Sequence, residues 1–327
     1  MGSARTLFTV AAPPITSQAT ELRLHAKDGY PLAGRLWSLS EDRLVHKAVM
    51  INSGAGINCG FYNRFASFLA DQGVPTLVYD YRGIGGSRPR SLRGFRASVE
   101  EWGSKDCAAA LDWLSERFPG ATRVVVGHSV GGFVTGFITN GALVDRMLLI
   151  SAHTGYWRDY GRKARVPMYL LWHALMPFVT RVVGYFPGRR LRLLEDLPAG
   201  VALEWAQRRK PDFWSHLKLA DGSPDTVSIQ RYTRRFDAIR ARTLAIRFSD
   251  DPFATKEATE RILGLYKNVT ATRLVLATTD GDGRPIGHFG FFSSRFRDTL
   301  WPLVFRELFS ETLVNEVSPT PQSASSV

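Results

Sequence analysis

Residues 123–132 have the sequence RVVVGHSVGG, and the interpretation of the whole chain grows from these ten positions. Residues 124–126 are valines, which predict a buried strand. A G-x-S-x-G set, residues 127–131, follows at once, and a helix-compatible run begins at Phe133. A chain that passes from strand to helix within one residue needs glycine beside it, because side chains there would collide with both elements. The sequence therefore predicts that Ser129 stands clear of the sheet, where a nucleophile would lie.

Strand and helix patterns alternate on both sides of this turn. Two alternating stretches, separated by Lys27-Asp28-Gly29, predict an opening hairpin. This rhythm is typical of an α/β fold with a mostly parallel central sheet and helices on both faces. The strands are expected at 21–26, 32–38, 47–52, 75–81, 124–126, 144–151, 243–248 and 272–276, and the helices at 61–72, 98–118, 133–139, 256–266 and 293–309.

The alternation stops in the middle of the chain. From residue 154 to residue 236 no strand pattern occurs, only aromatic, Arg-rich helical segments interrupted by prolines. We expect a helical cap here, inserted after the sixth strand and above the carboxyl edge of the sheet. It would divide the α/β core into 21–153 and 237–312. An N-terminal extension, 1–20, and a Ser- and Pro-rich tail, 313–327, complete the chain, and we expect the tail to be disordered.

The formal net charge of +12 is concentrated in this middle segment. Residues 156–235 hold fifteen Lys or Arg against seven Asp or Glu. Such a balance suits nucleic acid, an anionic lipid surface or an acidic substrate. No nucleic-acid module is recognisable, and the arginines alternate with apolar helix positions. We therefore expect a solvated basic face and no nucleic-acid partner.

Cysteine usage and hydropathy give three further expectations. Two cysteines, Cys59 and Cys107, provide neither a disulfide framework nor a metal-ligand cluster, so we expect a cytoplasmic protein without a metal or another cofactor. The short apolar run before Pro13 is too weak for a secretory signal. The apolar stretch 168–186 is interrupted by proline and arginine, which favours a pair of cap helices over a membrane span. Contact with a membrane surface is an alternative that we do not expect.

A serine hydroxyl needs a base to become a nucleophile, and the base needs an orienting acid. Of seven histidines, His288 alone lies in a loop after the final strand, in PIGHFGFF, and we expect it to be the base. The side chain of His128, beside the serine, should point away from the serine oxygen. The other five lie in the N-terminal strands or at and within the cap: His25, His46, His153, His173 and His216.

The orienting acid should follow the preceding strand, in LAIRFSDDPFA. Asp251 is preferred because Pro252 fixes a turn directly after it, and Asp250 is the main competitor. Asp280 and Asp282, in TTDGDG, are typical of a turn. The resulting order along the chain is Ser, Asp, His.

A tetrahedral intermediate also needs backbone N–H donors for its oxyanion. The amide of Val130, directly after the serine, is one candidate. The other should come from the loop NSGAGI, residues 52–57, whose small side chains let the backbone approach a substrate. The amides of Gly54 and Ala55 both fit, and the sequence does not separate them.

These residues, together with YDYRGIGGS at 79–87, resemble the α/β-hydrolase superfamily, near its monoglyceride-lipase-like and serine-aminopeptidase-like branch. The resemblance implies an α/β-hydrolase fold and the catalytic set Ser129, Asp251 and His288. More narrowly, FYNRFASFLA, DYRGIGGSRP, LLWHALMP, GYFPGRRL, EDLP and FSDDPFA resemble a group of largely uncharacterised bacterial α/β hydrolases. One departure is Asn52-Ser53-Gly54, which stands where His-Gly is usual in the oxyanion loop.

The cap aromatics favour an apolar substrate. We expect Trp157, Trp172 and Trp205 to contact a small acyl substrate, although most cap aromatics should pack the cap onto the sheet. The arginines at 189, 190 and 192 could hold an anionic group or pair with nearby carboxylates. The expected reaction is hydrolysis of a carboxylic ester or thioester through an acyl-Ser129 intermediate. The alternatives are a peptidase, amidase or acyltransferase with the same residues, and a non-catalytic binding protein.

Overall fold

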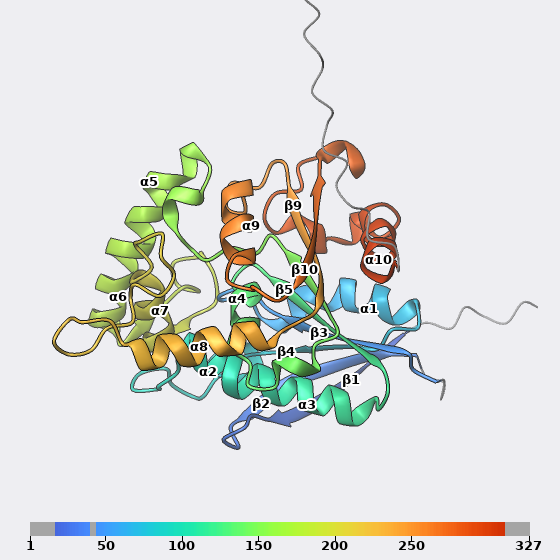
Figure 1. Ribbon diagram of the computed structural model, residues 1–327, viewed down its shortest axis with the longest axis horizontal. Helices are drawn as coiled ribbons and strands as arrows, with labels where there is room; N and C mark the ends of the chain where they lie inside the picture. The colour runs from blue at the N-terminus through green and yellow to red at the C-terminus, as the bar shows by residue number, and fades with distance from the viewer. Residues whose placement is uncertain (1–16, 40–43, 311–327) are drawn as a thin grey trace, which may run out of the picture.

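The computed structural model describes residues 17–39 and 44–310, so the expected tail lies outside the described residues. An eight-stranded sheet crosses the middle of the molecule in the order β1-β2-β4-β3-β5-β6-β9-β10 (Figure 1). β2 pairs antiparallel with both β1 and β4, and every later pair is parallel. The strands are β1 (Gln18–His25), β2 (Pro31–Ser38), β3 (Lys47–Asn52), β4 (Thr76–Tyr79), β5 (Thr122–His128), β6 (Arg146–Ile150), β9 (Arg242–Phe248) and β10 (Thr270–Leu276).

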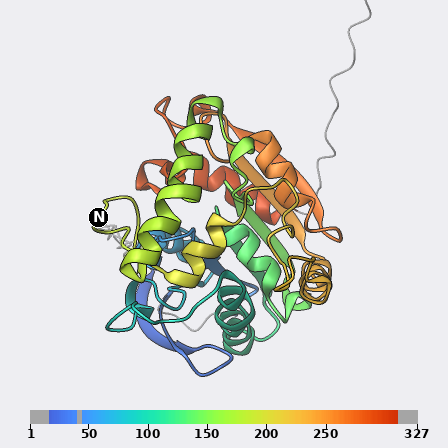
Figure 2. The same ribbon diagram turned by 90° about the vertical axis from the view of Figure 1, so that its left-hand side faces the viewer.

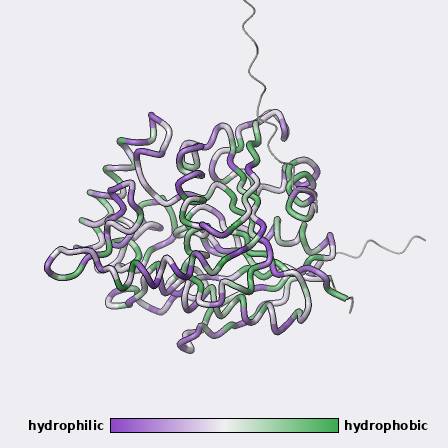
Figure 3. Tube along the Cα trace, viewed as in Figure 1, coloured by the Kyte–Doolittle hydropathy of each residue, from purple (hydrophilic) through white to green (hydrophobic). Residues whose placement is uncertain are grey.

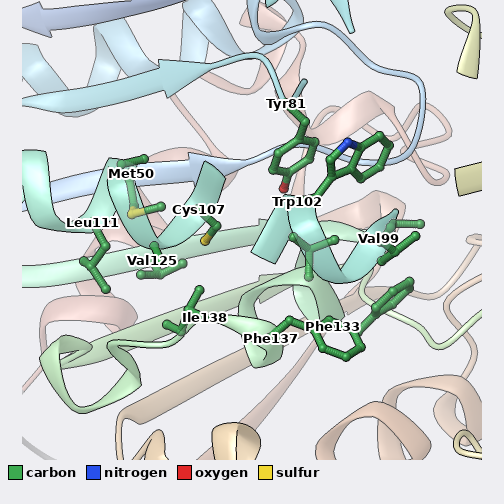
Figure 4. Close-up of a cluster of buried hydrophobic side chains, with 14 of the residues drawn as sticks. Met50, Tyr81, Val99, Trp102, Cys107, Leu111, Val125, Phe133, Phe137 and Ile138 are labelled. Atoms are coloured by element: carbon green, nitrogen blue, oxygen red, sulfur yellow. The ribbon is translucent and has the colours of Figure 1, made fainter. Parts of the chain in front are cut away.

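Helices cover both faces of this sheet, as the alternation predicts. Val125 of β5 faces one buried cluster, whereas Val124 and Val126 face another, because successive side chains of a strand point to opposite faces. α3, α4, α8 and α9 contribute to the first cluster, and α1 and α10 to the second. Figure 4 shows part of the first, where Met50 of β3 and Val125 lie opposite Leu111 of α3. The helices are α1 (Asn63–Asp71), α2 (Val99–Glu101), α3 (Ala108–Arg117), α4 (Gly131–Val134), α5 (Arg162–Leu170), α6 (Met176–Val183), α7 (Ala199–Ala206), α8 (Thr226–Ala238), α9 (Lys256–Leu263) and α10 (Leu300–Phe309).

Most predicted elements lie close to the observed ones, with four local differences. The helix expected at 293–309 begins only at Leu300, because a 3-10 turn, Ser294–Phe296, occupies its expected start. β1 begins at Gln18, inside the expected extension. The helix expected at 98–118 is one helical run, but a π-helical turn, Trp102–Cys107, connects α2 to α3. The helix after the serine is shorter than predicted, because α4 ends at Val134 and a single 3-10 turn follows. The hairpin turn between β1 and β2, at the bottom of the view, is hydrophilic (Figure 3).

Most of the segment between β6 and β9 forms a layer of its own at one end of the molecule, whereas its last helix, α8, packs against the first buried cluster of the core. α5, α6 and α7 lie there, beyond the carboxyl ends of the strands (Figures 1 and 2). A π-helical turn joins α5 and α6 into one run, Arg162–Val183. Among the described residues this run alone is long and apolar enough to cross a membrane, by length and composition only. A two-residue ribbon pairs β7 (Tyr185–Phe186) with β8 (Leu197–Pro198), where no strand was expected, because so short a pair leaves no alternation in the sequence.

Candidate active site

The turn at Ser129 has the strained geometry that its glycines predict. Ser129 follows β5 with a φ of 53°, in the left-handed region that residues other than glycine rarely adopt. A Cβ added to Gly131 would lie 2.1 Å from the Asn52 carbonyl oxygen, and one added to Gly127 would lie 2.7 Å from Gly132 Cα. Larger residues at either position would therefore displace β3 or α4. The glycines hold the serine at the carboxyl end of the central strand.

The structure brings Ser129, His288 and Asp251 together. His288 Nε2 lies 2.9 Å from Ser129 Oγ, and His288 Nδ1 lies 2.9 Å from Asp251 Oδ2. Burial by itself raises the pKa of Asp251, but the hydrogen bond and charge of His288 outweigh it, so the pKa lies below its usual range. An ionised Asp251 fixes the proton of His288 on Nδ1 and leaves Nε2 free to accept the serine proton.

Asp250, the competing acid, lies against the main chain instead. Its carboxylate accepts hydrogen bonds from the amides of Ile286, at 2.8 Å, and Gly287, at 3.1 Å. These two residues immediately precede His288. Asp250 therefore holds the loop that carries the imidazole, and its hydrogen bonds go to the backbone of this loop and not to the imidazole. Neighbouring carboxylates thus bind neighbouring parts of one loop.

The two candidate amides of the oxyanion loop differ in their partners. The Gly54 amide donates to the Tyr62 hydroxyl at 2.9 Å, so it is already occupied. Within residues 17–39 and 44–310, no intramolecular hydrogen bond engages the amides of Ala55 and Val130. Both residues line the cavity that contains Ser129. The amides of Ala55 and Val130 are therefore available to bind an oxyanion. Of the two candidates in the loop 52–57, Gly54 and Ala55, the structure favours Ala55.

His128 links the loops on either side of the serine. Its Nε2–H donates to the His288 carbonyl oxygen at 3.0 Å, and its Nδ1 accepts from the Tyr62 hydroxyl at 2.9 Å. Burial lowers the pKa of His128 to about 3, so the ring is neutral and can play both parts. The hydrogen bonds run from Gly54 through Tyr62 and His128 to His288. The side chain of His128 thus binds Tyr62 and the His288 carbonyl group and not the Ser129 hydroxyl.

A cavity of about 440 Å³ opens beside Ser129, between the sheet and the α5–α7 layer. Its walls are mostly apolar and aromatic, with residues from the long helical run on one side. Trp172 and Trp205, which we expect to contact the substrate, both line this cavity. Trp157 does not line the cavity: it lies in a 3-10 turn, and its ring packs against Tyr169 of α5, with centroids 4.8 Å apart. Other lining residues include Met168, Leu171, Met176, Leu194, Val201 and Phe289.

The arginines that follow α6 either pair with carboxylates at the rim of the cavity or are exposed. Arg189 donates to Glu195 at 2.6 Å, and its amide donates to Asp196. Arg190 and Arg192 are exposed. Because Glu195 lines the cavity and is paired in this way, the rim carries little uncompensated negative charge.

The sequence DYRGIGGS, residues 80–87, forms the loop after β4. Asp80 accepts hydrogen bonds from the amides of Cys59, at 2.6 Å, and Gly86, at 2.8 Å. Arg82 bonds to the fully buried Asp106 at 2.8 Å. These contacts provide partners for backbone amides and for a buried carboxylate, so this loop stabilises the fold. Within the described chain, no group of three or more His, Cys, Asp or Glu is arranged to hold a metal ion.

The order of the strands in the sheet is that of the α/β-hydrolase fold. The site is also typical of this fold, because a strained serine follows the fifth strand and meets a histidine and an aspartate from later loops. The chain belongs to the family whose model is described as serine aminopeptidase, S33, which matches residues 44–218, more than half of the chain. By fold and by family the chain therefore belongs to the α/β-hydrolase class.

Individual relatives are distant. The curated acylamino-acid-releasing enzyme 2 of Oryza sativa subsp. japonica is 28% identical over 150 residues, 44% of this chain, and the match spans only 19% of that relative. A thermophilic esterase from Thermogutta terrifontis is similar with a TM-score of 0.55 and 16% identity, over 88% of this chain and 98% of that one. The esterase of Pyrococcus furiosus has a TM-score of 0.54 and 14% identity, over 93% and 94%. These solved structures share the fold.

Proposed function

We propose that the protein hydrolyses carboxylic esters or thioesters of apolar acyl groups through an acyl-Ser129 intermediate. One observation carries the proposal: a serine oxygen bonded to an aspartate-oriented imidazole lies on the wall of a largely apolar cavity. A structural serine would need neither the strained turn nor the buried imidazole.

The chemistry follows from the contacts. His288 Nε2 takes the hydroxyl proton as Ser129 Oγ attacks the acyl carbon, and the Ala55 and Val130 amides donate to the oxyanion. The protonated imidazole then gives its proton to the departing alcohol or thiol. Water, activated by the same nitrogen, releases the acid and regenerates the serine. Asp251 stabilises the imidazolium in both halves of the cycle.

Peptidase and acyltransferase activities use the same groups and are the alternatives. An aminopeptidase needs an uncompensated carboxylate for the substrate's amino terminus. Glu195, which lines the cavity, already accepts from Asn58 at 3.1 Å and Arg189 at 2.6 Å. This pairing favours an ester over a peptide with a free amino terminus. An acyltransferase would differ only in using an alcohol in place of water.

Labelling with a fluorophosphonate tests the proposal. Wild type should be labelled, and Ser129→Ala should lose both labelling and turnover of p-nitrophenyl esters while keeping its thermal unfolding temperature. Removal of the nucleophile typically costs about 10⁶-fold in kcat. Rates across esters of increasing acyl length would then measure the cavity. A folded wild type that neither labels nor turns over ester would favour the binding-protein alternative, and Ser129→Ala with activity within tenfold of wild type would exclude Ser129 as the nucleophile.

A further inference from the structure

A second imidazole contacts the serine oxygen. His153 lies three residues beyond the end of β6 and lines the cavity, with its Nε2 3.3 Å from Ser129 Oγ. The centroids of the His153 and His288 rings are 5.5 Å apart. The serine oxygen is therefore in contact with two histidines, and the reaction as described above uses one of them.

The hydrogen bonds assign opposite tautomers to these two rings. The Gly155 amide donates to His153 Nδ1 at 3.0 Å, so this nitrogen carries no proton. Burial lowers the pKa of His153 to about 3, so the ring is neutral and its single proton is on Nε2. His153 Nε2–H consequently donates to Ser129 Oγ. His288 Nε2, in contrast, accepts from it.

The surroundings hold the His153 ring in this orientation. Gly155 has a φ of 83°, and a Cβ there would lie 2.9 Å from the Trp205 ring. The sequence His-Thr-Gly therefore allows the backbone to turn back onto the imidazole. Tyr160 packs edge-on against the ring at 5.6 Å between centroids. His153 cannot leave the serine without disturbing this packing.

We propose that His153 is a second catalytic residue, a neutral donor that stabilises negative charge on Ser129 Oγ. The inference rests on the proposed function. As the Oγ–H bond breaks, its proton moves to His288 Nε2, and the Oγ electron pair forms the bond to the acyl carbon. In deacylation that bond breaks, the pair returns to Oγ, and His288 returns the proton. His153 keeps its own proton throughout, and its hydrogen bond strengthens whenever Oγ carries charge.

Two substitutions separate the donor from the space that it fills. His153→Gln keeps an N–H near the position of Nε2, whereas His153→Leu fills similar volume without a donor. With p-nitrophenyl esters, His153→Leu should lower kcat roughly 10- to 100-fold, with KM changed less than about threefold. The rate of fluorophosphonate labelling should fall in parallel. His153→Gln should recover kcat to within about fivefold of wild type.

His173→Leu is the matched control. His173 is also buried and hydrogen-bonded, to the Ala206 carbonyl, but it does not line the cavity. Its kcat should stay within about twofold of wild type. The proposal is wrong if His153→Leu keeps kcat within threefold, or if His153→Gln loses as much as His153→Leu while both remain folded.

A measurement independent of turnover distinguishes this proposal from the proposed function. Long-range ¹H–¹⁵N spectra of the free protein should show His153 as the neutral Nε2–H tautomer from pH 5 to pH 8. An Nδ1–H tautomer, or titration near pH 6.5, would overturn the inference even in an active enzyme. If instead wild type fails to label or hydrolyse esters while this tautomer is present, the proposed function fails and the assigned catalytic role of His153 fails with it.

Discussion

At the scale of single residues, Asp250 and Asp251 are adjacent in sequence but bind different parts of the histidine loop. Asp251→Asn should lower kcat by about 10³- to 10⁴-fold, because an amide at this position favours the wrong tautomer of His288. Asp250→Asn retains one acceptor oxygen for the backbone of residues 286–287, so its kcat should fall less than about tenfold. Steady-state kinetics of both purified variants checks this order. The reverse ranking would assign the orienting role to Asp250.

Sequence motifs and the expected order of the strands predicted Ser129, Asp251 and His288, which the structure brings together. The choice between Gly54 and Ala55 was not accessible in this way, since it depends on the Tyr62 hydroxyl reaching the Gly54 amide. His153 was assigned to the border of the cap. Its signal, a histidine just past a strand that neighbours the serine strand, becomes meaningful only when β5 and β6 are known to be adjacent.

At the scale of elements, an ion pair at the end of α7 links this helix to the core, because each of its two partners also contacts a core residue. Arg208 is 4% exposed, donates to Glu204 at 3.2 Å and lies over the ring of Phe133 at 4.2 Å. Glu204 in turn accepts from the Val99 amide at the start of α2. Glu204→Ala should reduce the free energy of unfolding by roughly 3–5 kcal/mol, because it leaves a buried guanidinium without its carboxylate.

Urea unfolding measures this change in stability. The double variant Glu204→Leu with Arg208→Met is the control, since it removes both charges and keeps apolar volume. It should be more stable than Glu204→Ala alone. A Glu204→Ala variant that loses less than about 1 kcal/mol would show that solvent or another group compensates for the guanidinium.

Long, strongly patterned elements were predictable and short irregular ones were not. The strand expected at 47–52 is β3, Lys47–Asn52, because its apolar run has clear ends. The π-helical turns Trp102–Cys107 and Leu171–Leu175 left no mark in the pattern, since they change the helical period over only one or two turns. Both turns carry residues that line the cavity, Trp102, Leu171 and Trp172. Sequence patterns thus located the core better than the pocket.

At the scale of the whole molecule, buried histidines make stability depend on pH. His128 and His153 have pKa values of about 3 in the folded protein, lowered by burial, against about 6.5 when exposed. Below pH 6.5 the unfolded chain binds protons that the folded one does not, so stability is complete above pH 6.5 and is lost as the pH falls toward 3. Between pH 6.5 and 5 the loss should be about 2 kcal/mol for each ring.

Urea midpoints at pH 7 and pH 5 test this sign and size. His153→Gln removes one of the two groups, so its stability should fall less steeply with acid than that of wild type. If the stability of the two proteins fell equally with pH, the assignment of His153 as a ring that stays neutral in the folded protein would be contradicted.

The hydrogen bonds that run from Gly54 through Tyr62 and His128 to His288 join two segments more than two hundred residues apart in sequence. Neither segment can open without breaking a buried hydrogen bond of this chain. The two segments should therefore unfold locally as one cooperative unit, with a single free energy of opening. Amide hydrogen exchange at Gly54 and Ile57 in one segment, and at Ile286 and Gly287 in the other, would then have matching protection, because these amides are hydrogen-bonded. A covalent adduct held by one segment would slow exchange in the other, and a local fluctuation would disable the proposed oxyanion donor Ala55 and the proposed base His288 together.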